Sequence, residues 1–285
     1  MAKRHELNAP GDWFIDTSCI DCAASREVAP GLIVARGGQS IFTRQPETDE
    51  ELRMAWRARL LCPTASIHTE TRKAAPQNLF PQELIPGIYR LGYNARSSFG
   101  AHSYLIRRPA GNVMVDSPRW TNALVAKLKA WGGLSDILLS HRDDVADAGR
   151  YAEHFSSNVW IHEWDHSGAR FADKLIEGRE PAEIAKDLLA VPVPGHTKGS
   201  VVYLYDGRAA FTGDSLALSH RDGNLTAFRQ ACWHSWSEQI ESLRRLLAQS
   251  FEWVFAGHGG SGHFPAAEIR TRLAALIERM ALMAE

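Results

Sequence analysis

Four short apolar segments of the chain each lead into a turn that contains histidine or aspartate. The first segment, Ile137–Leu139, has the length of a buried strand. In chain order, the polar residues of these turns are His141, Asp143, Asp144 and Asp147 together, then His196, then Asp214, and finally His258. Ligand sites in open α/β sheets lie in the crevice beyond the strand ends, so these side chains are expected to converge. Because histidine and carboxylate bind divalent metals such as zinc, the pattern predicts a metal site.

The turns also resemble the motifs of the metallo-β-lactamase superfamily of metal-dependent hydrolases. The most specific motif is His196-Thr197-x-Gly199-Ser200 with its preceding glycine, which is similar to the glyoxalase II branch. The other matching stretches are Thr212-Gly213-Asp214 and Gly257-His258-Gly259. The resemblance covers residues 85–265. It implies an α/β (α+β) fold with a four-layer αβ/βα sandwich, which we assign to residues 76–285.

The first motif departs from the H-x-H-x-D-H pattern of that superfamily. Counting from His141, the matching positions hold Asp143, Val145 and Ala146. One histidine is therefore replaced by aspartate, and the Asp-His pair is missing.

This departure changes the set of metal ligands that the resemblance implies. A first metal would keep the ligands His141, Asp143, His196 and Asp214. A second would keep His258 and the shared Asp214, unless a shifted register lets Asp144 or Asp147 replace the lost residues. We therefore expect one well-held divalent ion, Zn or Fe, and a second ion that is weakly bound or missing.

A metal with an open coordination position lowers the pKa of a bound water toward about 7 and polarises a carbonyl oxygen. This chemistry hydrolyses esters, lactones and thioesters without a protein nucleophile. Asp214 would hold the metal and orient the hydroxide, while Asp144 or Asp147 would take or return a proton. The first hypothesis is therefore a metal-dependent hydrolase of a small ester, lactone or thioester.

Two other functions stay open. His141, His196 and Asp214 form the two-histidine, one-carboxylate set of non-haem iron oxygenases. Some members of the resembling superfamily, including sulfur dioxygenases, use iron in this way. The altered first motif also allows a non-catalytic protein that uses the cleft for binding.

The N-terminal part carries a second pattern, Cys19-x2-Cys22 followed by Cys62-Pro63. Residues 1–75 resemble a small ferredoxin-like α+β domain, whose family binds an iron–sulfur cluster through C-x2-C-x2-C and a distant Cys-Pro. Ser25 stands where the third cysteine is expected, so a cluster on Cys19, Cys22 and Cys62 is doubtful. A degenerate domain kept for packing is favoured. A three-iron cluster, a four-iron cluster with an oxygen ligand, or a zinc site are the alternatives.

A proline-containing polar stretch, residues 64–84, predicts the boundary between the two parts. After it comes the hairpin segment 92–102, which in the resembling fold overhangs the metals and shapes the substrate pocket. Tyr93, Arg96 and His102 are therefore candidate substrate contacts, with a solvated hairpin as the alternative.

The composition narrows the class of partner. The 285 residues carry a net charge of −1, without the basic excess of a nucleic-acid-binding protein. No apolar run approaches the roughly 20 residues that span a bilayer. The four cysteines are too few for a disulfide framework, and the N-terminal residues lack the apolar stretch of a signal peptide. We expect a cytoplasmic protein with a small-molecule substrate and no nucleic-acid or membrane partner. A homodimer is an open alternative for its assembly.

Overall fold

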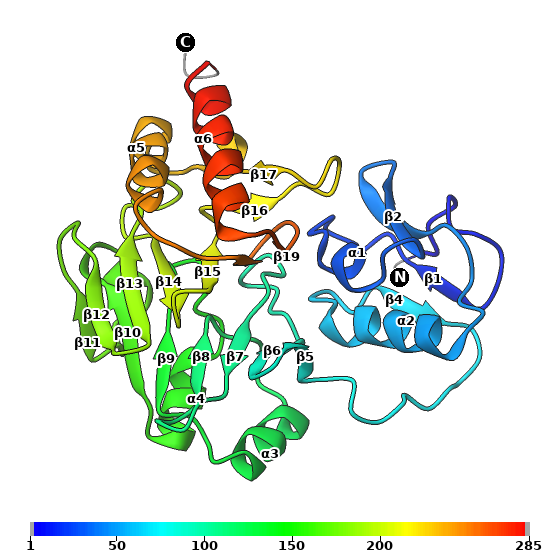
Figure 1. Cartoon of the computed structure of the whole chain (residues 1–285). Coiled ribbons are helices and arrows are strands. Elements are labelled where there is room, and N and C mark those ends of the chain that lie inside the picture. The colour runs from blue at the N-terminus through cyan, green and yellow to red at the C-terminus, as the bar shows by residue number, and fades with distance from the viewer. Residues whose placement is uncertain (1–2, 283–285) are drawn as a thin grey trace.

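The computed structural model describes residues 3–282, and its larger part is built on two β-sheets that face each other (Figure 1). The first sheet has the strand order β11-β10-β9-β8-β7-β6-β5, and the second has the order β12-β13-β14-β15-β18-β19. The first sheet consists of β5 (Gln82–Ile85), β6 (Ile88–Arg90), β7 (Tyr104–Ile106), β8 (Val113–Val115), β9 (Asp136–Leu138), β10 (Asn158–His162) and β11 (Lys174–Ile176). The second consists of β12 (Ala182–Ala185), β13 (Leu188–Pro192), β14 (Val201–Tyr205), β15 (Ala209–Gly213), β18 (Trp253–Ala256) and β19 (Gly262–His263).

Helices cover the outer face of each sheet. α3 (Asn122–Ala130) and α4 (Ala148–Phe155) pack on the first sheet, and α5 (Trp236–Leu246) and α6 (Ala266–Leu282) pack on the second (Figure 1). The predicted four-layer αβ/βα sandwich is therefore confirmed. Among the helices in residues 3–282, none has both the length and the apolar character that crossing a bilayer requires.

Aromatic side chains fill the space between the two sheets. Tyr104 from the first sheet meets Phe211 and Phe255 from the second, and all three ring centroids lie 5.3–5.5 Å apart. These separations lie in the range that favours contact between aromatic rings. The strands here read as continuous apolar runs because a helix layer covers the other face of each sheet.

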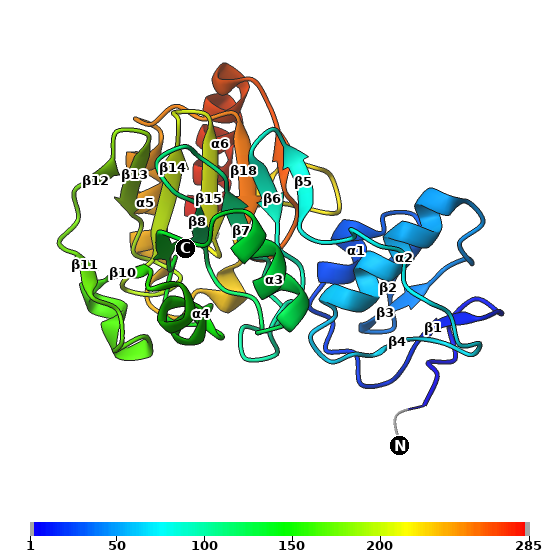
Figure 2. The same cartoon turned by 90° about the horizontal axis from the view of Figure 1, so that it is seen from below.

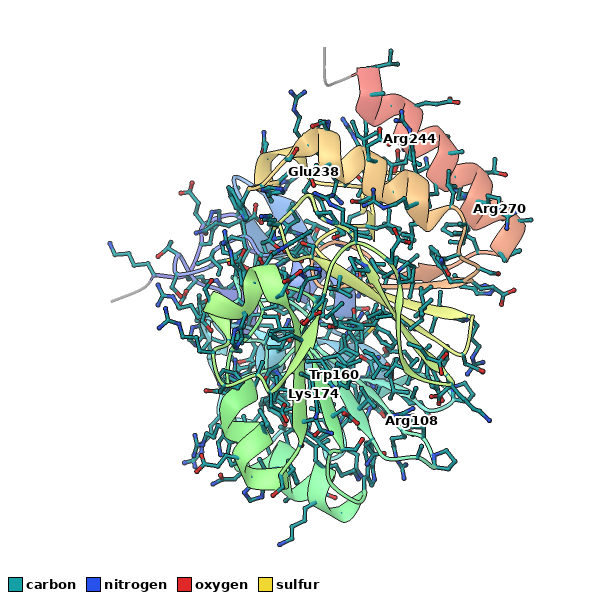
Figure 3. The ribbon with its side chains drawn as sticks, turned by 90° about the vertical axis from the view of Figure 1, so that its left-hand side faces the viewer. Arg108, Trp160, Lys174, Glu238, Arg244 and Arg270 are labelled. Carbon is teal, nitrogen blue, oxygen red and sulfur yellow. The ribbon has the colours of Figure 1, made fainter. Side chains whose placement is uncertain are left out.

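The outer helices are amphipathic. In α5, Ile240, Leu243 and Leu246 are buried against the second sheet. Figure 3 shows Glu238 and Arg244 on this helix and Arg270 on α6, where the two arginines are exposed. The side-chain oxygen of Ser235 accepts the backbone N–H of Glu238 at 3.2 Å and caps the start of α5.

The N-terminal part forms its own apolar cluster beside the sandwich (Figure 2). Its elements are β1 (Trp13–Ile15), α1 (Ala24–Val28), β2 (Ile33–Arg36), β3 (Gln39–Phe42), α2 (Asp49–Leu61) and β4 (Ile67–Thr69). Trp13 packs edge-on against Trp56 with ring centroids 5.2 Å apart. Leu79 and Phe80 still belong to this cluster, so the first sheet begins only two residues after it ends. The boundary near residue 75 stays a prediction.

The two parts are joined by partly buried polar contacts. The Arg119 guanidinium donates to the backbone oxygens of Leu60 and Cys62 in the N-terminal part, at 2.7 and 3.1 Å. It also donates to the backbone oxygen of Asn94 at 2.8 Å. On the other side, the Glu27 carboxylate of α1 accepts from Arg90 at 3.1 Å. The segment after β6 is therefore held against the end of α2.

Candidate metal centre

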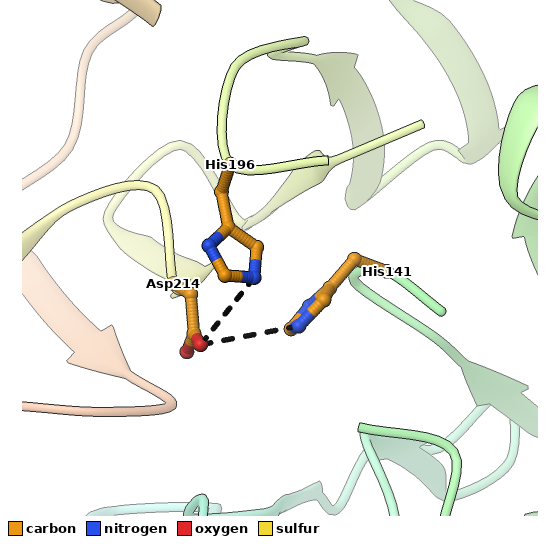
Figure 4. Close-up of side chains that lie close together, drawn as sticks. All are labelled: His141, His196 and Asp214. Atoms are coloured by element: carbon orange, nitrogen blue, oxygen red, sulfur yellow. Dashed lines mark ion pairs between the residues drawn. The ribbon is translucent and has the colours of Figure 1, made fainter. Parts of the chain in front are cut away.

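Four strand ends converge on one buried carboxylate, that of Asp214 at the end of β15. His141 follows β9, His196 follows β13 and His258 follows β18. The Nε2 atoms of His141, His196 and His258 lie 3.9, 3.6 and 3.9 Å from Oδ2 of Asp214. Figure 4 shows how His141 and His196 point toward Asp214. In residues 3–282, only these two histidines and Asp214 bring three candidate ligand atoms all within 4.8 Å of one another.

Several polar atoms of this group lack a partner among the described residues. Nε2 of His141, Nε2 of His196 and Oδ1 of Asp214 are buried without a hydrogen bond. Leaving such groups unpaired costs about 1–3 kcal/mol each, so the arrangement calls for a ligand. Two imidazole nitrogens and a carboxylate are suitable donors for Zn or Fe(II). The residues present therefore fit a divalent metal ion.

His141 is oriented from behind by its neighbours. Its Nδ1 lies 2.9 Å from Oγ of Ser140, whose backbone N–H donates to the Asp116 carboxylate at 2.7 Å. When Nδ1 donates its proton to that hydroxyl, the Nε2 lone pair faces Asp214. Burial lowers the pKa of His141 to about 4, so the ring is neutral near pH 7. Such support from the second layer of residues fixes the tautomer that a metal needs.

The electrostatics of the group favour a cation. Burial raises the pKa of Asp214, but His258, His141 and His196 outweigh it, and the net shift is downward. Burial lowers the pKa of His196, but the Asp143 carboxylate and Asp214 outweigh it and raise it. The same negative field that raises the pKa of His196 would attract a metal ion.

Two of the three acids after His141 reach the group. Oδ2 of Asp143 lies 3.6 Å from Nε2 of His196, although the Asp143 side chain is 46% exposed. Asp144 is only 2% exposed, and its Oδ2 makes no hydrogen bond to a described residue. A Cβ atom on Gly257 would lie 2.8 Å from Oδ1 of Asp214 and 3.1 Å from Oδ2 of Asp144, so these two carboxylates share one neighbour.

The structure does not bring the other sequence candidates into this group. Asp147 accepts the backbone N–H of Trp120 at 2.6 Å at the start of α4. Tyr93 packs against Phe80 and the Arg119 guanidinium at the junction of the two parts. His102 is 1% exposed, and its Nδ1 lies 3.2 Å from the Asn94 side-chain nitrogen. Of the three expected substrate contacts, only Arg96 is exposed.

Asp165 is a supporting residue that the motifs do not reveal. Its carboxylate accepts from the Thr197 hydroxyl at 2.5 Å and from the backbone N–H of Gly199 at 3.1 Å. It also accepts the backbone N–H of Arg142 at 3.1 Å. One fully buried carboxylate thus ties the turn of His141 to the turn of His196. No local spacing signals this role, because Asp165 lies in a separate 3-10 turn, Glu163–Gly168.

Two exposed aromatic rings lie beside His258 and His196. Phe99 is 54% exposed, and its ring centroid lies 6.0 Å from that of His258. Trp233 is 63% exposed and lies 6.3 Å from His196. Each ring therefore presents an exposed apolar surface next to one of these histidines.

The cysteines of the N-terminal part line a different pocket. Cys19, Cys22, Cys62 and Ser25 all face it, and no disulfide joins the thiols. An iron–sulfur cluster with four corners would find three thiol donors and one hydroxyl here. The donor set therefore fits three corners of such a cluster.

A first prediction concerns metal content. His196→Ala removes one ring nitrogen of the group, so we expect metal per chain, measured by elemental analysis, to fall well below the wild-type value. Cys232→Ser is the matched control, because its thiol donates to the backbone oxygen of Gly195 at 3.1 Å without entering the group. Equal metal content in wild type and His196→Ala would contradict this site.

A second prediction concerns Asp165. Asp165→Ala frees the turns of His141 and His196 from each other, so zinc affinity should fall roughly 10–100-fold. Competition with a chromogenic chelator measures this change. Asp173→Ala serves as a control, because Asp173 accepts the backbone N–H of Val159 outside the site. Unchanged affinity in Asp165→Ala would show that the turns hold their positions alone.

Comparison with known proteins agrees with the geometry. Residues 15–69 match the family model of the 4Fe-4S single cluster domain of Ferredoxin I. A lactamase-like protein of Pestalotiopsis microspora is 26% identical over 63% of this chain and 56% of its own length. A hydroxyacylglutathione hydrolase of Fuscovulum blasticum is 33% identical over 36% of this chain and 42% of its own length. The chain thus spans about half the length of these two relatives.

A solved structure extends the comparison. The DIM-1 metallo-β-lactamase superposes with a TM-score of 0.55 at 17% identity, over 70% of this chain and 95% of that one. Together with the sheet order and the layers, this likeness confirms the fold that the sequence predicts. The chain has the metallo-β-lactamase fold, preceded by a segment that matches the ferredoxin family.

Proposed function

We propose that this chain is a metal-dependent hydrolase of a small ester, lactone or thioester. The observation that carries the proposal is the convergence of His141, His196 and Asp214, with unpaired buried atoms facing one another. A divalent ion bound there supplies an activated water and a Lewis acid for a carbonyl oxygen. One well-held Zn or Fe ion is proposed, with a second, weaker position toward His258 and Asp144.

The neighbouring side chains would serve this chemistry in different ways. Asp214 holds the centre of the ligand group. Oδ2 of Asp144 lies beside Asp214 with no partner of its own among the described residues, and burial together with the Asp214 carboxylate raises its pKa. A cation bound next to it would favour the ionised carboxylate, which could then orient the attacking water and accept its proton. Asp143 contacts His196 with a side chain that is 46% exposed.

The surroundings support a substrate with an apolar portion and a polar end. Phe99 and Trp233 offer exposed rings on two sides of the histidines. Arg96 is exposed in the same hairpin segment as Phe99 and could meet a carboxylate of the substrate. A relative is named for hydrolysis of hydroxyacylglutathione, a thioester with such carboxylates, which supports the thioester class.

A second candidate function is a mononuclear iron oxygenase. It is favoured by the two-histidine, one-carboxylate set and by the cysteine pocket next to the same hairpin segment. A non-catalytic binding protein is the third reading. The three differ in what the loaded protein does to a substrate.

The test uses the full chain loaded separately with Zn, Mn or, anaerobically, Fe(II). Thioester cleavage is followed by thiol release from hydroxyacylglutathione, lactone cleavage by a chromogenic lactone, and oxygenase activity by oxygen uptake with a thiol or persulfide. Hydrolysis with Zn or Mn that disappears in His196→Ala is the expected result. Oxygen uptake by the iron form alone would replace the hydrolase with the oxygenase. If neither activity is detected, the non-catalytic binding protein is the reading that remains.

A third prediction separates Asp144 from Asp147. Asp144→Asn replaces an unpaired carboxylate oxygen by an amide and should lower kcat roughly 100-fold. Asp147→Asn should keep the wild-type kcat, because the Asp147 side chain accepts the backbone N–H of Trp120 and lies outside the ligand group. Steady-state kinetics at fixed metal loading measures both variants. Equal loss in the two would mean that the effect is structural.

A further inference from the structure

We propose that Ser25, which stands in place of one of the four cysteines of a ferredoxin-type site, makes one iron labile in a cluster held by Cys19, Cys22 and Cys62. This cluster would be unequal at its corners, with three irons held by thiolates and one held only by the serine hydroxyl or by solvent. The inference does not depend on the proposed hydrolase activity.

The elements that carry the four residues bring them to one place. Cys19 and Cys22 lie in the turn before α1, Ser25 is the second residue of that helix, and Cys62 follows the last residue of α2. All four line the same pocket, and Ser25 is 7% exposed.

The spacing of the thiols separates a cluster from a single zinc ion. Zinc with Zn–S bonds of about 2.3 Å places its thiolates about 3.8 Å apart. The Sγ atoms of Cys19, Cys22 and Cys62 do not all lie within 4.8 Å of one another, because the only described group that meets this limit is the histidine–aspartate group. A cluster tolerates wider spacing, since each thiolate binds a different iron.

The pocket also carries a hydrogen-bonding partner for one of the thiols. The Cys62 Sγ atom lies 3.2 Å from the Ser66 hydroxyl. Hydrogen bonds to sulfur tune and stabilise such clusters.

The cluster would lie one loop away from the metal centre. A Cβ atom on Gly100 would approach Sγ of Cys22 to 2.8 Å, and the φ of Gly100 is +86°, so glycine allows this contact. The preceding residue, Phe99, packs beside His258. Two residues after Gly100, the backbone N–H of His102 donates to the backbone oxygen of Gly257 at 2.8 Å.

The test is anaerobic reconstitution of the full chain with Fe(II) and sulfide, followed by iron and acid-labile sulfide analysis and EPR spectroscopy. About four sulfides per chain are expected, and sulfide counts the cluster without counting the metal centre. Oxidation with ferricyanide should then convert a [4Fe–4S]2+ core to [3Fe–4S]+. Fe2+ leaves and ferricyanide accepts one electron, which gives the EPR signal of a three-iron cluster.

The decisive variant is Ser25→Cys. Its fourth thiolate should retain the fourth iron, so the three-iron EPR signal after ferricyanide should fall at least about fivefold relative to wild type. Cys22→Ser should lose most of the sulfide, and Cys232→Ser should retain it. The proposal is overturned if wild type binds no more sulfide than Cys22→Ser. It is also overturned if Ser25→Cys and wild type lose iron equally, or if the thiols take up a single zinc ion in place of a cluster.

Discussion

A carboxylate buried in a protein must be compensated by hydrogen bonds or by opposite charge, and the candidate site of this chain is built around that requirement at Asp214. Its side chain is 10% exposed and its Oδ2 has three imidazole nitrogens within 3.9 Å. His141, with its lowered pKa, contributes a neutral ring near pH 7 and so compensates the charge only weakly. A single divalent cation would pair with the carboxylate and with the imidazole lone pairs, so a metal ion would account for this arrangement of side chains.

The two-sheet sandwich supplies the rigidity that such a site needs. Each candidate ligand follows a different strand, so the relative positions of these side chains depend on the packing between the sheets. Asp165 then joins two of the turns directly. The segment from Asn94 to His102 completes the surroundings, because it touches both the Gly257 turn and the cysteine pocket. This shared segment is the physical link between the two parts of the chain.

Local patterns predicted the fold and the residues that converge. His196 and Asp214 sit in short motifs with apolar strands before them, so their positions follow from the sequence. The turn after His141 could not be read in the same way. Whether Asp144 or Asp147 faces the site depends on tertiary contacts, such as the bond from Trp120 to Asp147.

Long-range contacts also explain why the positions of Asp165 and Tyr93 could not be predicted from the sequence. Asp165 holds turns that are distant in sequence. The Tyr93 side chain lies at the junction of the two parts, in a segment with positive φ at Tyr93 and Phe99.

The most direct test of the metal site is X-ray absorption at the zinc edge of the chain loaded with one zinc ion. Nitrogen and oxygen neighbours at about 2.0–2.1 Å, including imidazole scattering, are the expected result. A shell of sulfur at about 2.3 Å would place zinc in the cysteine pocket and contradict the site at Asp214.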